Sequence, residues 1–116
     1  MKNLEEWIEE LKNSNKLIIV EGLKDKIALE ALGIKGIITI NKPFYKLIED
    51  ISKLRECILL VDLDREGRRI YNQLSSQLQK NRIKVDNRFR EFLFKNTKLT
   101  QIEGLTRYLI KNNINL

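Results

Sequence analysis

The stretch ILLVDLDREGRRI, Ile58 to Ile70, runs four apolar residues directly into two aspartates placed two positions apart, and then into arginines. A short, continuous apolar run of this kind is typical of a strand buried on both faces of a parallel sheet. Alternate residues of an extended chain point to the same side, so Asp62 and Asp64 can face together if the chain stays extended beyond Val61. The stretch therefore predicts a buried strand that ends in an acidic turn.

The same alternation of strand and helix occurs along most of the chain. Apolar runs predict strands at 16–20, 36–40, 57–61 and 82–85, and helical spacing predicts helices at 3–13, 23–32, 44–51 and 66–79. Gly33 supplies the left-handed residue that commonly ends a helix. This order predicts an α/β fold with a central, mainly parallel four-stranded sheet and helices on both faces. Residues 87–96 are compatible with either an extended or a helical segment, whereas 102–109 have the spacing of a terminal helix.

Length and composition restrict the class of protein. The chain has 116 residues, 42% of them hydrophobic and 33% charged, which predicts a single domain spanning 1–116. Its longest apolar runs are far shorter than a membrane span, so we expect a cytoplasmic protein without a membrane partner. The absence of histidine excludes serine–histidine catalysis and histidine-bound zinc. The single cysteine, Cys57, lies in an apolar run and is interpreted as a buried hydrophobic residue.

The positive charge is concentrated in one part of the chain. The net charge is +6, and residues 65–98 carry ten basic and three acidic side chains. Such a block suits a phosphate backbone, but a lysine-rich and arginine-rich surface is also a common way to keep a protein in solution. The charge pattern favours a nucleic-acid partner and leaves the second interpretation open.

Carboxylates follow two of the predicted strands. Glu21 ends the first strand, and Asp62 and Asp64 follow the third, so all three are expected at the carboxyl edge of the sheet. Three converging carboxylates repel one another unless a divalent cation lies between them, and oxygen ligands suit Mg²⁺ or Mn²⁺. The alternative is that Asp62 caps the following helix and that Asp64 or Glu66 stabilises its positive N-terminal end.

These two acidic segments resemble the signature of the Toprim domain. The first is a strand followed by Glu-Gly and a helix, and the second is a strand followed by Asp-x-Asp-x-x-Gly. The matching residues are Glu21, Gly22, Asp25, Ala28 and Leu29 in the first, and Asp62, Asp64 and Gly67 in the second. The resemblance spans about 16–86, and 87–114 are expected to form a helical extension.

The chain looks most similar to small stand-alone Toprim proteins of archaea. It also resembles the Toprim domains of 5S ribosomal RNA maturation nucleases and of bacterial-type primases. The resemblance implies a three-layer α/β/α Toprim fold in which Asp62 and Asp64 bind Mg²⁺. It also implies that Glu21 acts as a further metal ligand or as the general acid/base, so all three are the expected catalytic residues.

Several neighbouring residues are candidates for supporting roles. Gly22 and Gly67 are expected to permit the turns beside the carboxylates, and Asp25 to stabilise the first turn of its helix rather than to bind metal. The candidates for phosphate contacts are Lys24, Arg65, Arg68 and Arg69. The alternative for these arginines is that they only offset nearby carboxylates on a solvated helix.

Three functions agree with these features. The first is a Mg²⁺-dependent nucleic-acid phosphodiester hydrolase in RNA processing or in DNA repair and replication. The second is a non-catalytic module that binds Mg²⁺ and nucleic acid within a larger assembly, and the third is an enzyme acting on small phosphorylated metabolites. A homodimer or a larger complex also stays open. The amphipathic N-terminal helix, 3–13, with its Trp7 is a candidate contact surface, and the alternative is that Trp7 lies in the core.

Overall fold

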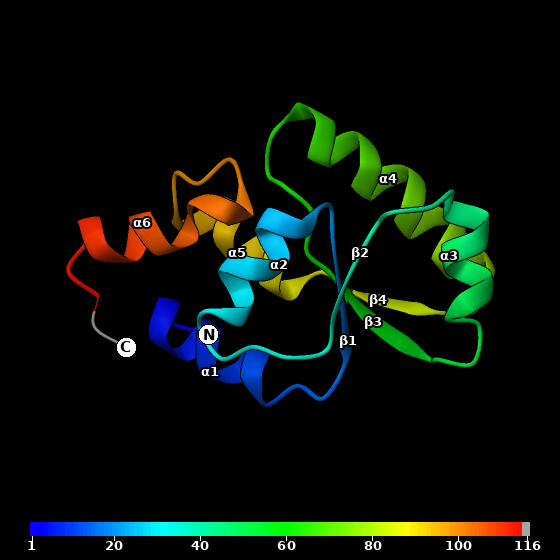
Figure 1. Ribbon diagram of the computed structural model, residues 1–116, viewed down its shortest axis with the longest axis horizontal. Coiled ribbons are helices and arrows are strands. Elements are labelled where there is room, and N and C mark those ends of the chain that lie inside the picture. Colours follow the sequence, from blue (N-terminus) through cyan, green and yellow to red (C-terminus); the bar gives the residue numbers. More distant parts are fainter. Residues whose placement is uncertain (115–116) are drawn as a thin grey trace.

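The computed structural model describes residues 1–114 (Figure 1). The first half of the chain forms α1 (Leu4–Lys12), β1 (Leu17–Val20), α2 (Leu23–Glu30), β2 (Ile37–Thr39) and α3 (Phe44–Asp50). The second half forms β3 (Glu56–Leu59), α4 (Arg65–Lys80), β4 (Lys84–Asp86), α5 (Arg88–Asn96), the 3₁₀ turn η1 (Ile102–Gly104) and α6 (Leu105–Lys111).

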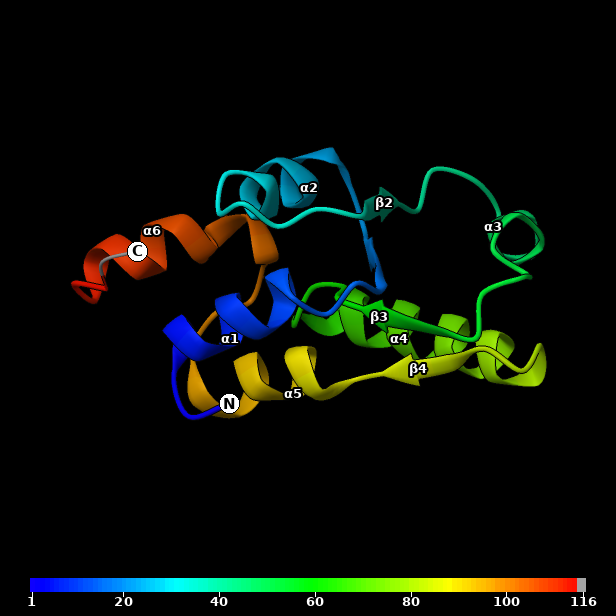
Figure 2. The same cartoon turned by 90° about the horizontal axis from the view of Figure 1, so that it is seen from below.

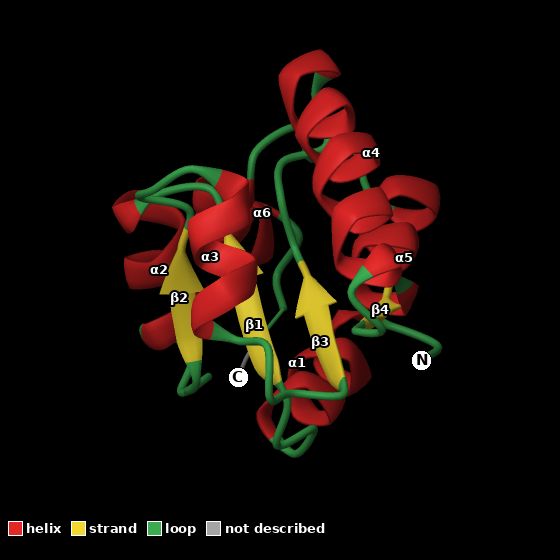
Figure 3. Ribbon diagram, turned by 90° about the vertical axis from the view of Figure 1, so that its right-hand side faces the viewer, coloured by secondary structure: helices red, strands yellow, loops and turns green. Residues whose placement is uncertain are grey.

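The strands form one parallel sheet in the order β2-β1-β3-β4. Ile18 of β1 lies opposite Ile37 of β2 and Ile58 of β3, and Ile58 in turn lies opposite Asp86 of β4. Figure 3 shows β1, β2 and β3 pointing the same way, and β4 pairs parallel to β3, so the carboxyl ends of the strands share one edge. The predicted α/β fold with a four-stranded parallel sheet is confirmed.

Two apolar clusters cover the two faces of the sheet. Alternate strand residues face opposite sides, so Ile18 and Ile58 pack in one cluster while Ile19 and Leu59 pack in the other. Buried residues of α1, α2, α5, η1 and α6 fill the first cluster, and those of α3 and α4 fill the second. The sheet is therefore the middle of three layers.

Trp7 belongs to the core and offers no contact surface. Its side chain is 0% exposed, its Nε1 donates a hydrogen bond to the carbonyl of Phe89 at 2.9 Å, and the two rings pack edge to face. Helices α1 and α5 consequently lie side by side (Figure 2). The core interpretation of Trp7 is confirmed, and its proposed role in a dimer contact is wrong.

The remaining local predictions concern helix ends and Cys57. Residues 88–96, left open by their sequence pattern, are helical. Helix α2 ends two residues before its predicted end, and Gly33 follows in the left-handed conformation with φ +84°. Cys57 is buried, and this burial raises the pKa of its thiol to about 11. No helix within 1–114 has the length and apolar character to cross a membrane.

Candidate metal centre

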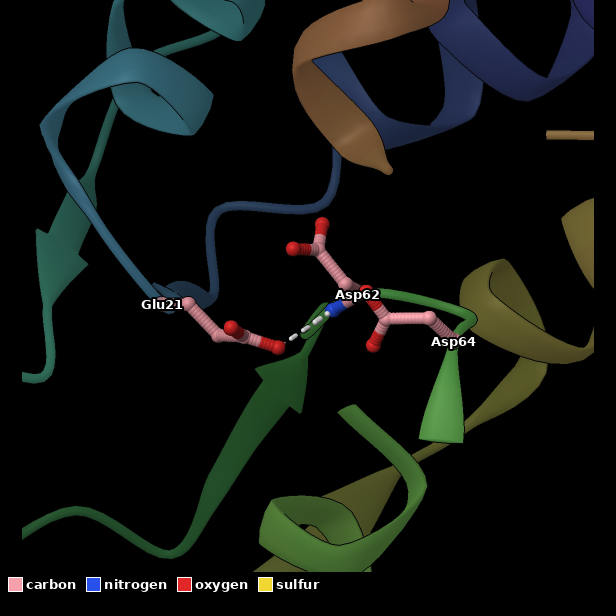
Figure 4. A group of neighbouring side chains, drawn as sticks. All are labelled: Glu21, Asp62 and Asp64. Atoms are coloured by element: carbon pink, nitrogen blue, oxygen red, sulfur yellow. Dashed lines mark hydrogen bonds between the residues drawn. The ribbon is translucent and has the colours of Figure 1, made fainter. Parts of the chain in front are cut away.

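Three carboxylates converge at the carboxyl edge of the sheet (Figure 4). Glu21 directly follows β1, Asp62 follows the end of β3, and Asp64 is the N-cap residue of α4. Each offers one oxygen that lies within 4.8 Å of the others. The structure thus brings together the three acidic residues that the sequence singled out.

The Glu21 side chain continues the hydrogen-bond ladder of the sheet beyond β1. The N–H of Leu60 donates to the carbonyl of Ile19 at 2.8 Å, as in a regular parallel ladder. Two residues further on, the N–H of Asp62 donates to Oε1 of Glu21 at 2.9 Å, so a carboxylate oxygen replaces a backbone carbonyl. This bond holds the Glu21 carboxylate against the backbone of Asp62, and the Asp62 carboxylate lies beside it.

Each of the three carboxylates is oriented by one backbone N–H. Glu21 accepts from Asp62, Oδ1 of Asp62 accepts from Ile102 at 2.8 Å, and Oδ1 of Asp64 accepts from Gly67 at 2.8 Å. Within the described part of the chain, the second oxygen of each carboxylate receives no protein hydrogen bond. Three oriented carboxylates with three free oxygens are a suitable donor set for a hard divalent cation.

The electrostatics of the centre disfavour three bare negative charges. Burial is the main cause that raises the pKa of Asp62 to about 7, and the charges of Asp25, Glu21 and Asp64 add to it. Burial also raises the pKa of Glu21, again with help from nearby carboxylates. A cation between the carboxylates would remove this penalty, because it favours their charged forms.

The spacing of the oxygens is compatible with a shared ion. Mg²⁺ binds oxygen ligands at about 2.1 Å, so two ligands of one ion are at most about 4.2 Å apart. The three carboxylate oxygens lie within 4.8 Å of one another, a comparable span.

Gly67 holds the acidic turn against the first turn of α4. A side chain at this position would overlap the backbone carbonyl of Asp62, so only glycine allows the close approach. The N–H of Gly67 is also the donor that caps Asp64. The cap of α4 is therefore Asp64 and not Asp62, which corrects the alternative interpretation of the sequence.

Gly22 and Asp25 have different roles from each other. Gly22 is extended, with φ −146°, and a Cβ atom there would meet no atom within 4 Å, so this turn itself does not require glycine. The Asp25 carboxylate accepts a hydrogen bond from the N–H of Gly22 at 3.1 Å and stabilises the first turn of α2, as predicted. Burial raises the pKa of Asp25, and the nearby negative charge of Glu103 raises it further.

The four cationic candidates lie on α2 and α4, the helices that follow the carboxylates, but they are not equivalent. Lys24 is exposed in the first turn of α2, and Arg65 and Arg68 are exposed in the first two turns of α4; within residues 1–114 none of these three forms an ion pair. Arg69 instead pairs with Glu66 and also donates to Gln73. The structure favours the charge-offsetting interpretation for Arg69 and leaves Lys24, Arg65 and Arg68 available to an anion.

Two groups at the centre were missed by the sequence analysis. The Arg90 guanidinium donates to the carbonyls of Val61 and Asp62, and the N–H of Ile102 donates to the Asp62 carboxylate. Arg90 lies in the basic block but beyond the region that resembles a Toprim domain. A backbone N–H has no sequence signal at all, so only the tertiary structure could identify Ile102.

Comparisons with known proteins agree with this architecture. Residues 15–87 match the Toprim domain. A UPF0292 protein of Methanocaldococcus jannaschii is 36% identical over 95% of this chain and 92% of its own length. A UPF0292 protein of Thermococcus sibiricus is 32% identical over 90% of this chain and 83% of its own.

A solved structure shares both the fold and part of the sequence. This putative protein from Aquifex aeolicus superposes with a TM-score of 0.83 and is 37% identical, covering 89% of this chain and 98% of that one. The predicted likeness to small archaeal Toprim proteins is confirmed by the archaeal relatives. Because the matched region covers more than half of its length, the chain belongs to the Toprim domain family.

Proposed function

We propose that this protein is a Mg²⁺-dependent phosphodiester hydrolase acting on nucleic acid. The observation that supports the proposal most strongly is the set of three backbone-oriented carboxylates with their free oxygens, in a chain of the Toprim family. Family membership and the acidic cluster together indicate a metal-dependent function related to nucleic acid. The proposal adds to this general function a specific reaction, the hydrolysis of a phosphodiester bond.

Under this proposal Glu21, Asp62 and Asp64 hold the metal, with Mn²⁺ as an alternative ion. The bound ion would supply charge stabilisation for the phosphodiester as negative charge develops on its oxygens. As the general acid/base, Glu21 would use its free oxygen to take a proton from the attacking water or to return one to the leaving oxygen. Lys24, Arg65 and Arg68 provide cations for flanking phosphates. The open space beside the Cα of Gly22 lets a ligand approach the backbone there.

The test is cleavage of three substrates by purified protein: structured RNA, single-stranded DNA and duplex DNA. Each is incubated with Mg²⁺, Mn²⁺ or a chelator. We expect metal-dependent products that disappear in Asp62→Asn and Glu21→Gln. Asp50→Asn is the matched control, because it removes one exposed negative charge from α3 and leaves the centre intact. Unchanged cleavage by Asp62→Asn would refute the proposal.

A second candidate is a non-catalytic module that binds metal and nucleic acid within a larger assembly. The observation that favours it is an exposed apolar surface on α2, the helix that follows Glu21. Leu23 and Ile27, one helical turn apart, are 65% and 56% exposed. A partner protein could cover this surface. Metal-dependent retention of nucleic acid without any product would support the module over the hydrolase.

A further inference from the structure

The chain that follows β3 and carries Asp62 extends beyond the end of the neighbouring strand β4. β4 ends at Asp86, opposite Ile58, whereas the β3 chain runs on through Val61 to Asp62. On the β1 side, the Glu21 carboxylate accepts the hydrogen bond of the Asp62 N–H. On the β4 side, the carbonyls of Val61 and Asp62 have no strand to pair with.

Arg90 occupies this position. Its Nε donates to the carbonyl of Val61 at 3.2 Å, and its Nη2 donates to the carbonyl of Asp62 at 2.9 Å. The guanidinium carbon also lies 4.8 Å from the ring centroid of Tyr71 on α4, a cation–π distance. The fork of Arg90 therefore ties α5, α4 and the acidic turn together.

We propose that Arg90 is a positioning residue for the metal centre. The two peptide groups that flank the Asp62 Cα are both held. In the first, the Asp62 N–H donates to Glu21 and the Val61 carbonyl accepts from Arg90. In the second, the Asp62 carbonyl accepts from Arg90 and also faces Gly67. Fixing both flanking peptide groups fixes the direction in which the Asp62 carboxylate leaves the backbone. Since α5 lies beyond residues 15–87, the part of the chain after the Toprim match then shapes the centre. The inference depends on the proposed function only in requiring that the centre binds a divalent cation.

The test is the affinity for Mn²⁺, measured from the signal of free Mn²⁺ in electron paramagnetic resonance and independent of any catalytic activity. We expect Arg90→Met to weaken binding about 10-fold to 100-fold, the range for loss of a group that orients a ligand. Arg90→Lys can reach only one of the two carbonyls and should weaken binding less. Tyr71→Leu removes the ring and keeps both hydrogen bonds, so its effect should be the smallest of the three.

Arg88→Met is the matched control. It removes a guanidinium from the same helix, but Arg88 pairs with Asp86 and not with the acidic turn. This variant should lose stability and keep the Mn²⁺ affinity of the wild type. If Arg90→Met and Arg88→Met bind Mn²⁺ equally well, or lose affinity equally, the positioning role is overturned. Should Arg90→Met fail to fold, wild-type affinity in Arg90→Lys overturns it.

Failure of the proposed function looks different in the same experiment. Wild-type protein that binds no Mn²⁺, or an Asp62→Asn variant that binds as well as the wild type, removes the metal centre and this inference with it. Wild-type binding that Asp62→Asn abolishes and Arg90→Met leaves unchanged removes only the inference about Arg90.

Discussion

Asp62 follows β3, Asp86 ends the neighbouring strand β4, and the two are similarly buried, yet their surroundings are opposite. Their exposed fractions are 8% and 6%. Asp62 is surrounded by carboxylates, and its burial and their charges raise its pKa to about 7. Burial also acts to raise the pKa of Asp86, but hydrogen bonds from Arg88 and Lys16 outweigh it and hold this pKa at about 2.

The contrast separates a structural carboxylate from a candidate metal ligand. Asp86 has its counter-ions within the protein, because Lys16 and Arg88 both lie 3.1 Å from it. Asp62 receives one backbone N–H and no cationic side chain within the described residues. A buried carboxylate without a counter-ion costs free energy in the folded state, and a ligand that supplies positive charge would recover it. The unpaired aspartate, and not the paired one, is therefore the candidate for a functional site.

The largest expected difference between the two aspartates concerns metal binding. Asp62→Asn removes a charged ligand, and we expect the Mn²⁺ affinity to fall by a factor on the order of 100. Asp86→Asn should retain the wild-type affinity, because Asp86 points into its own ion pairs. Isothermal titration calorimetry on both variants measures the difference. Equal losses of affinity in the two variants would contradict the contrast.

Without metal, Asp86→Asn should lower the free energy of unfolding and Asp62→Asn should not, the reverse of their effects on metal binding. Asp86→Asn leaves Lys16 and Arg88 without their buried partner and should lower the free energy of unfolding by about 2 kcal/mol. Asp62→Asn keeps an oxygen acceptor for the Ile102 N–H and removes a buried charge. At pH 8 in chelator it should raise the free energy of unfolding by about 1–3 kcal/mol. Urea denaturation of the three proteins tests this order.

The two aspartates should also give opposite dependence on pH. Between pH 4 and 7 the folded state keeps the Asp62 proton that the unfolded state has released, so stability in chelator falls as pH rises through this window. Asp86 acts the other way, because its stabilising contribution is lost as pH falls from about 4 toward 2. Thermal melts from pH 2 to 8 should show a maximum at mildly acidic pH. A curve for Asp62→Asn as steep as that of the wild type between pH 4 and 7 would exclude Asp62 as the source.

The smallest expected effect concerns the cations around the acidic turn. Lys24→Ala should reduce the slope of log affinity against log salt for single-stranded nucleic acid by about 0.7, the value for one lost phosphate contact. Lys35→Ala is the matched control, because Lys35 precedes β2 and lies at the opposite end of the sheet. Fluorescence anisotropy at several salt concentrations measures both slopes. Identical slopes for the two variants would show that Lys24 makes no phosphate contact.

Much of the architecture could be read from local patterns. The four apolar runs became the four strands, and the helical spacings became the helices between them, because burial on a sheet imposes a short apolar run and burial on one face imposes a period of 3.6. The positions of Glu21, Asp62 and Asp64 followed from the same argument, since parallel strands place their carboxyl ends at one edge. Their roles as ligands and catalytic groups remain predictions.

The sequence by itself determined which carboxylates meet, because strand ends are encoded by residues close together in the chain and parallel strands share one carboxyl edge. Only the tertiary structure decided how those carboxylates are held and which cations stay free. Arg90 and Ile102 reach Asp62 from 28 and 40 residues away. Such partners are chosen by packing between distant segments, which leaves no periodic trace in the sequence.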